Sequence, residues 1–501
     1  MLKGKWILFF GVVGLLFGCG EEKQKPSSTN SEEAAMPNIV YILADDLGYG
    51  DLSIYGQEKF DTPNIDKLAK EGLLFTQHYS GSTVCAPSRS ALMTGMHTGH
   101  TPIRGNRAAG WTNPHEEGQF PLKAETLTLA EILKQQGYKT GAFGKWGLGF
   151  IGTEGDPNKQ GFDEFYGYNC QGQAHRYYPT HLWDNEKKII LEANDTKNNE
   201  LYAPDVIHEK ALGFIKNNAD NPFFMFVPSV IPHAELIAPK DSIWDEFADT
   251  FDEKPWGNDK TSGPRWKGND YGADDYSARG YASQEKPRTA FAAMVTRLDR
   301  QVGEIVTLLK DLGIAENTLI MFTSDNGPHM EGGADPDFFN SSGIVRGRKR
   351  DLYEGGIRVP MIAKWPRHIK AGRTTKHVSA FWDILPTFAE MTDADLPENI
   401  DGISMLPILK GQTENQKKHD HLYWEFHEQN GKQAVRMGNW KGIRLKVFDD
   451  PEAPIELYDI SKDLKELNNI AQEHPQIVTE IYNLMKSSRT VNEDFPFPPK
   501  S

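Results

Sequence analysis

Four continuous apolar runs, separated by helical patterns, limit the folds open to this chain. The runs are NIVYIL (38–43), FFMFVPSV (223–230), TLIMFTSDNG (318–327) and RVPMIAKWP (358–366). Helical patterns lie between them, among them TPNIDKLAKEG (62–72), with a proline in its first turn, and the amphipathic stretch 291–313. Strands that are apolar on both faces and joined by helices are typical of a mostly parallel sheet flanked by helices. We therefore predict an α/β fold.

The C-terminal part, residues 413–501, has a different pattern. Short strand-like runs separated by turns are followed by one helical stretch, namely HLYWEFHE, QAVRMGNWKGIRL, PIELYDI and HPQIVTEIYNLMKSS. This pattern predicts a smaller antiparallel sheet with one packed helix. We expect residues 37–412 to form the catalytic domain and residues 413–501 to complete one wall of its pocket.

The N-terminus indicates export. Lys3 and Lys5 precede about a dozen apolar residues, too few for a membrane-spanning helix of ~20 residues. The segment ends in LLFGC, which matches a bacterial lipoprotein box, and the alternative is a chance cysteine after an apolar segment. Residues 1–18 are therefore predicted to be a signal peptide, Cys19 to carry lipid, and residues 19–36 to form a polar tether. The protein would be anchored to a membrane, at the cell surface or facing the periplasm.

The net charge of the chain limits the classes of molecule that it can bind. The formal net charge is −15, which argues against a nucleic-acid partner because phosphate binding needs a basic surface. The densest basic cluster, RGRKR at 346–350, would make a local positive spot that attracts an anion.

Acidic and amide side chains follow two of the predicted strands. Asp45 and Asp46 come after the first run, and Asp325 and Asn326 come within the third. In parallel sheets, sites form beyond the carboxyl ends of the strands. Four oxygen donors suit calcium or magnesium rather than zinc or copper. The alternative is that each acid forms a turn or caps a helix.

The motif CAPSR (85–89), followed by LMTG, occurs with ADDLGYGD, GKWGLG, TSDNGPH and EGGIRVP. These blocks, in this order over residues 37–490, strongly resemble the type I sulfatases. The resemblance implies an alkaline-phosphatase-like fold and one calcium ion bound by Asp45, Asp46, Asp325, Asn326 and modified Cys85. It also implies that a maturation enzyme oxidises Cys85 to formylglycine. A disulfide between Cys85 and Cys170 is the weaker alternative.

The resemblance also assigns roles to charged residues. Arg89 would hold the formylglycine, and Lys145 and Lys349 would neutralise sulfate oxygens. His233 would protonate the leaving oxygen, with or without Lys349. Without the family pattern, each of these residues could equally be an ion-pair partner or a buried histidine.

One position departs from the family. Most members have a histidine after Gly-Lys-Trp, but this chain has Gly147. We consider His175 the first candidate for a replacement. We also expect His175, Arg176 and Arg104 to bind substrate, although the aromatic stretch 166–183 could instead be a loop pinned by its side chains. Residues 241–290 have no clear period and are expected to ring the pocket mouth.

The block from GKWGLG to NCQGQAH is similar to a carbohydrate-sulfatase subgroup. It implies a sulfatase acting on a sulfated poly- or oligosaccharide, with algal glycans such as ulvan or a carrageenan-type galactan favoured. A phosphodiesterase or phosphonate hydrolase of the same superfamily, and a non-catalytic glycan-binding lipoprotein, are the alternatives.

Overall fold

The computed structural model describes residues 6–11, 36–109, 118–195, 197–257 and 281–498. Residues Met36–Ser501 form one compact unit, and residues Met1–Ala35 form a separate one. Cys19 and most of the predicted signal peptide and tether lie outside the described residues. None of the helices formed by the described residues combines the length and apolar character needed to cross a membrane. The boundary at residue 412 stays a prediction.

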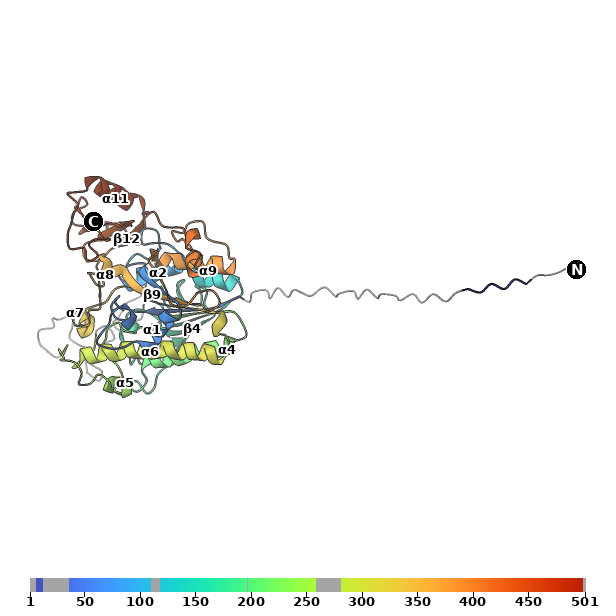
Figure 1. Ribbon diagram of the computed structural model, residues 1–501. Helices are drawn as coiled ribbons and strands as arrows, with labels where there is room; N and C mark the ends of the chain where they lie inside the picture. Colours follow the sequence, from blue (N-terminus) through green and yellow to red (C-terminus); the bar gives the residue numbers. More distant parts are fainter. Residues whose placement is uncertain (1–5, 12–35, 110–117, 196, 258–280, 499–501) are drawn as a thin grey trace. The chain divides into compact units, whose positions relative to one another are not determined.

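The main sheet has parallel strands at its centre (Figure 1). Within the described residues, its strands run in the order β10-β2-β9-β8-β1-β7-β3-β4-β5-β6, and β11 pairs with β2. The strands are β1 (Asn38–Ala44), β2 (Leu73–Tyr79), β3 (Lys139–Lys145), β4 (Glu164–Tyr168), β5 (His181–Asp184), β6 (Lys187–Ile190), β7 (Phe223–Pro228), β8 (Thr318–Ser324), β9 (Arg358–Lys364), β10 (Arg373–Thr375) and β11 (Ser379–Ala380). β9 runs antiparallel to both β2 and β8, and β4, β5 and β6 form an antiparallel edge.

Helices cover both faces of this sheet. Figure 1 shows α4 and α6 on one side and α2 and α9 on the other. Alternate residues of β1 explain the two layers, because Val40 and Ile42 belong to one buried apolar cluster and Ile39 and Tyr41 to another. The helices are α1 (Pro63–Lys70), α2 (Cys85–Thr94), α3 (Leu129–Gln135), α4 (Ala203–Asn218), α5 (Ser242–Asp245), α6 (Pro287–Asp311), α7 (Pro336–Phe339), α8 (Glu354–Ile357), α9 (Ile384–Thr392) and α10 (Leu406–Leu409). The predicted α/β fold is confirmed.

A second sheet forms near the C-terminus. Strands β12 (Leu422–Phe426), β13 (Lys432–Met437), β14 (Trp440–Leu445) and β15 (Ile455–Asp459) are antiparallel, and α11 (Pro475–Ser487) packs on them through Ile481 and Met485. Trp424 joins this sheet to the first one, because its indole donates to the Ser80 carbonyl and its ring lies 5.4 Å from that of Tyr79. The predicted smaller sheet with one helix is therefore confirmed.

Candidate active site

The carboxyl ends of β1 and β8 bring the predicted acids together. Ala44 pairs with Ser324 in parallel register, so the next residues, Asp45 and Asp325, leave the sheet side by side. The Asp46 amide donates to Asp325 Oδ1 at 3.1 Å, and Asn326 Nδ2 donates to Asp46 Oδ1 at 2.7 Å. All four side chains are buried. Two acid pairs 279 residues apart in sequence thus share one site.

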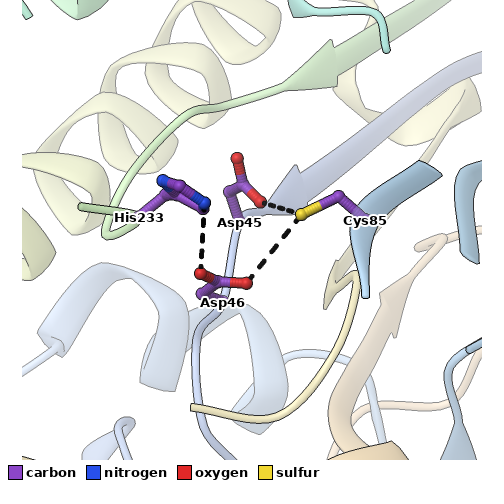
Figure 2. Close-up of side chains that lie close together, drawn as sticks. All are labelled: Asp45, Asp46, Cys85 and His233. Atoms are coloured by element: carbon purple, nitrogen blue, oxygen red, sulfur yellow. Dashed lines mark hydrogen bonds and ion pairs between the residues drawn. The ribbon is translucent and has the colours of Figure 1, made fainter. Parts of the chain in front are cut away.

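Cys85 is the first residue of α2 and points at this cluster (Figure 2). Its Sγ lies 3.3 Å from Asp45 Oδ1 and 4.0 Å from Asp46 Oδ1. Burial, together with the nearby carboxylates of Asp325 and Asp45, raises the pKa of the Cys85 thiol well above its usual value. An unmodified thiol here is protonated and a poor nucleophile. The described chain contains no disulfide between Cys85 and Cys170, and both are buried.

Three buried cations surround the carboxylates. Arg89, one turn along α2 from Cys85, donates to Asp325 Oδ2 through Nε at 3.1 Å and Nη2 at 2.9 Å. Lys145, the last residue of β3, lies 2.6 Å from Asp45 Oδ2 and 3.4 Å from Cys85 Sγ. Lys349 lies 2.7 Å from Asp46 Oδ2. All three predicted cations therefore converge on the predicted nucleophile and acids.

Two histidines stack beside the cluster. His233 Nε2 lies 3.1 Å from Lys349 Nζ and 3.5 Å from Asp46 Oδ2. Burial, with Lys349 next to it, lowers the pKa of His233 well below its usual value, so the imidazole is neutral. The His175 ring is nearly parallel to that of His233, with centroids 5.3 Å apart, and burial lowers its pKa to about 3.

The oxygen-rich side of the cluster fits a hard divalent cation. Burial, and then the neighbouring carboxylate of Asp45, raises the pKa of Asp325 even though Arg89 lies beside it, so a cation bound next to this carboxylate would favour its charged form. Asn326 Oδ1 is buried and accepts no hydrogen bond from the described residues. Ligand atoms of Asp45, Asp46, Cys85 and His233 lie within 4.8 Å of one another. Carboxylate and amide oxygens are the ligands that calcium prefers.

A cavity of about 300 Å³ opens above Cys85. Of the predicted residues, His175, His233 and Lys349 line it with Cys85. Tyr281 and Arg350, from two stretches that the sequence placed at the pocket, also line it, whereas sequence reasoning missed its other polar residues, which are Asn106, Arg107, Gln119, Gln171 and Glu428. Glu428 follows β12, so the C-terminal sheet does supply part of the wall. Within RGRKR, only Lys349 and Arg350 line the cavity, and Arg350 pairs with Glu331 at 2.6 Å.

Two predicted substrate-binding residues are elsewhere, and that expectation was wrong. Arg104 is buried against β12, where it donates to the Thr490 carbonyl at 2.8 Å and pairs with Glu425 at 3.3 Å. Arg176 is buried and pairs with Glu235 at 2.8 Å. Neither lines the cavity. Both cations neutralise buried carboxylates that lie far away in the sequence.

The aromatic stretch 166–183 is largely structural. Tyr168 and Tyr177 are fully buried, and the Tyr177 hydroxyl donates to the carbonyls of Val230 and His233. The alternative of a loop pinned by its aromatic side chains therefore describes these two tyrosines. Of the predicted loop 241–290, residues 242–245 form α5, α6 begins at Pro287, and residues 258–280 lie outside the described part.

Comparisons with known proteins agree with this geometry. Residues 37–394 match the family described as Sulfatase, and residues 347–491 match the C-terminal region of N-sulphoglucosamine sulphohydrolase. The chain is 29% identical to N-acetylgalactosamine-6-O-sulfatase of Bacteroides thetaiotaomicron, covering 95% of this chain and 97% of the relative. It is 32% identical to arylsulfatase A of Homo sapiens, covering 90% and 87%.

A solved structure supports the same assignment. The crystal structure of Ps i-CgsB in complex with k-i-k-neocarrahexaose superposes with a TM-score of 0.73 at 28% identity, covering 92% of this chain and 94% of that one. The family match extends over more than half of the chain, and the matched residues include the buried cluster around Cys85. The chain therefore belongs to the sulfatase family and is a sulfuric ester hydrolase.

Proposed function

We propose that this sulfatase releases sulfate from a sulfated glycan through a formylglycine made from Cys85, with one calcium ion bound beside it. The observation that carries the proposal is the placement of Cys85 between three carboxylates and three cations at the base of a cavity. A protonated, buried thiol is poorly suited to attack, whereas a residue with hydroxyl groups at this position can be activated by its neighbours.

The bound ion would be held by Asp45, Asp46, Asp325 and Asn326 and would supply positive charge that favours an ionised hydroxyl. The hydrated aldehyde carries two hydroxyl groups, so one can displace the substrate alcohol at sulfur, and deprotonation of the other expels sulfate as the carbonyl re-forms. Lys145 and Lys349 would stabilise the charge on the sulfate oxygens, because both lie within reach of Cys85 or the cavity.

The leaving oxygen needs a proton, and the charged Lys349 beside the neutral His233 can supply it. Lys349 Nζ and His233 Nε2 share a hydrogen bond at 3.1 Å, and both line the cavity. His233 is held in place by its other nitrogen, since Nδ1 lies 2.5 Å from the Ala234 carbonyl. We therefore assign proton donation to Lys349, with His233 accepting from its ammonium group and orienting it.

Substrate class rests on the relatives and on the polarity of the cavity. The relatives named above include an N-acetylgalactosamine-6-O-sulfatase and a protein crystallised with a neocarrahexaose. The cavity wall offers amides, a tyrosine hydroxyl and the Glu428 carboxylate, which are groups that bind sugar hydroxyls. A sulfated galactan of the carrageenan type is our first choice of substrate, and ulvan is the next.

We also propose that the enzyme is an exported lipoprotein held to a membrane through Cys19. The basis is the LLFGC sequence and the polar residues after it. Mass spectrometry of the membrane fraction would detect a lipid-modified N-terminal peptide that begins at Cys19. A soluble protein that begins elsewhere would contradict the proposal.

One experiment tests the main proposal. Purified enzyme is incubated with defined sulfated galactose and N-acetylgalactosamine oligosaccharides, and sulfate release is measured by ion chromatography. Phosphate and phosphonate monoesters serve as controls, because a phosphonate monoester hydrolase shares the fold, with a TM-score of 0.61. Sulfate release with a formylglycine at position 85 supports the proposal. Hydrolysis of the phosphorus esters alone, or activity with an unmodified cysteine, would contradict it.

A further inference from the structure

Gly147 leaves a space beside the nucleophile that another side chain fills. A Cβ atom added to Gly147 would lie 3.5 Å from Gln171 Nε2, 3.6 Å from Gln171 Cγ and 3.7 Å from Arg89 Cδ. These are ordinary contact distances, so the Gln171 amide already lies over Gly147 and next to Arg89. His175, the candidate from the sequence, instead stacks on His233, on the side of Lys349.

Gln171 is connected to the nucleophile through a second amide. Its Nε2 donates to Asn106 Oδ1 at 3.2 Å, and the same oxygen accepts from the backbone N–H of Ala86 at 3.1 Å. Ala86 follows Cys85 directly in the first turn of α2. Cys85, Asn106 and Gln171 all line the same cavity. An amide chain therefore leads from the space above Gly147 to the residue next to the nucleophile.

The contacts fix which groups of the two amides remain available. Asn106 Oδ1 already accepts two hydrogen bonds, which orients Nδ2 as the remaining donor. Among the described residues, no acceptor bonds to that Nδ2, and none donates to Gln171 Oε1. One donor and one acceptor are thus left on residues that line the same cavity as Cys85.

The loop that carries Gln171 does not need this side chain for its own structure. Gln173 Oε1 accepts from the Asn169 N–H at 2.8 Å, and Gln173 Nε2 donates to the His181 carbonyl at 2.9 Å. Asn169 Oδ1 in turn accepts from the Ile151 N–H at 2.8 Å. Because other residues hold the loop, the Gln171 amide is not needed for the loop structure and can bind groups in the cavity.

We infer that Gln171 and Asn106 form an amide pair that positions the oxygens of the modified Cys85 and of the sulfate beside it. The inference rests on the proposed function and names two positioning residues that the sequence did not indicate. A carboxamide donates and accepts hydrogen bonds but exchanges no proton near neutral pH. The pair therefore orients the reacting groups without acting as an acid or a base.

The test uses the full-length enzyme, four single variants and one double variant. Gln171→Ala removes the amide, Gln171→Glu keeps its shape but cannot donate to Asn106, and Asn106→Asp keeps the acceptor but loses the donor. Gln173→Ala is the matched control, because it loosens the same loop without touching the cavity. For each variant we would measure kcat and KM on a sulfated oligosaccharide, the melting temperature, formylglycine occupancy at position 85, and the Kd of inorganic sulfate by calorimetry.

We expect Gln171→Ala to lower kcat about 10-fold and to raise the Kd of sulfate several-fold, as loss of one neutral hydrogen bond predicts. KM and formylglycine occupancy should change little. Combining Gln171→Ala with Asn106→Asp should cost less than the product of the two single losses, because the two amides act as a unit. If Gln171→Ala does not fold, kcat and the Kd of sulfate of the near-isosteric Gln171→Glu and Asn106→Asp variants test the inference instead.

Two results would overturn the inference. One is wild-type kcat and sulfate affinity in folded, fully modified Gln171 and Asn106 variants. The other is the same pair of losses in Gln173→Ala, which would reduce Gln171 to a loop residue. Failure of the proposed function itself would look different, because the wild-type enzyme would then release no sulfate from any sulfate ester.

Discussion

The protein buries two clusters of charge that are built in different ways. The catalytic cluster contains Asp45, Asp46, Asp325, Arg89, Lys145 and Lys349. The second, here called the Glu354 network, joins the two sheets and contains Glu354, Glu466, Lys441, Arg358 and Arg436. Lys441 lies 2.9 Å from Glu354 and 3.1 Å from Glu466, and Arg358 lies 3.2 Å from Glu354. Tyr79, which also accepts from Arg436, donates to Glu354 at 2.6 Å.

Each cluster holds one carboxyl group whose pKa burial raises, Asp325 in the catalytic cluster and Glu466 in the Glu354 network, and the two clusters differ in their access to the cavity. Burial alone would raise the pKa of Glu354, but Lys441 and Arg358 outweigh it and hold that pKa below its usual value. In the catalytic cluster, burial and Asp45 leave the pKa of Asp325 raised, and Asn326 Oδ1 has no donor in the described chain. No member of the Glu354 network lines the cavity. The Glu354 network therefore lies off the cavity wall, whereas the catalytic cluster opens to the cavity through Cys85 and Lys349.

The largest effect should come from Cys85→Ser. A single hydroxyl can accept the sulfuryl group but cannot expel it, so multiple turnovers should fall on the order of 10⁶-fold, as for loss of other enzyme nucleophiles. The melting temperature should stay within about two degrees of the wild type. Intact-protein mass spectrometry should show sulfated enzyme after one turnover. Sustained turnover by this variant would contradict the assignment of the nucleophile.

Asp325→Asn should show that the catalytic cluster binds calcium, a property that we do not expect of the Glu354 network. Removing a ligand charge should lower bound calcium and reduce kcat by about 10²-fold or more, since a catalytic metal supplies several kcal/mol. Calcium should raise the melting temperature of the wild type, because a ligand that binds only the folded state stabilises it, and should do so much less for the variant. Metal analysis with calorimetric melting in calcium or chelator checks this. Full metal occupancy and normal activity would reject the site.

Lys441→Met should lower the stability of the fold and leave activity and calcium binding unchanged. Removing one partner from a buried ionic network leaves uncompensated charge and typically costs about 3–5 kcal/mol of unfolding free energy. Lys441 is fully buried and does not line the cavity, so kcat per folded molecule and calcium binding should match the wild type. Chemical unfolding and active-site titration measure the two quantities. A loss of kcat at unchanged stability would show that the network serves catalysis.

The smallest effect concerns His419, which pairs with Asp383 at 2.7 Å. Burial would lower the pKa of His419, but Asp383 outweighs it and raises the pKa above the usual 6.5. This pair therefore stabilises the fold fully below pH 6.5, and its contribution is lost as pH rises through the raised pKa. The difference in unfolding free energy between wild type and His419→Gln should be largest near pH 6 and small near pH 9. An equal difference at both values would contradict the ion pair.

The sheet was predictable where strands are buried on both faces. The runs 38–43 and 318–327 identified β1 and β8, and the rule for carboxyl ends then placed Asp45 beside Asp325. The direction of β9 was not predictable, because an apolar run reads the same in a parallel or an antiparallel pair. The edge strands β5 and β6 carry too little apolar pattern to identify.

The positions of individual side chains were harder to predict from the sequence than the strands. Arg104 was expected at the substrate, but its partner Glu425 lies 321 residues away, and no local pattern reveals such a pair. Gln171 and Asn106 were missed because a single amide has no diagnostic spacing. The one signal for Gln171 was indirect, since Gly147 marked an absent side chain. Glu428 could be anticipated only as part of a wall formed by the C-terminal sheet.

The burial of Cys85 limits when its proposed oxidation to formylglycine can take place. Cys85 is 1% exposed and is the first residue of α2. Asp325, which accepts hydrogen bonds from Arg89 of the same helix, lies 236 residues after Arg89 in the chain. Because the folded protein buries Cys85, a modifying enzyme can reach its thiol only before this segment has folded. At typical synthesis rates, the intervening residues take on the order of 10 to 50 seconds to make. Because Asp325 is made only after that interval, the finished site cannot form around Cys85 any sooner.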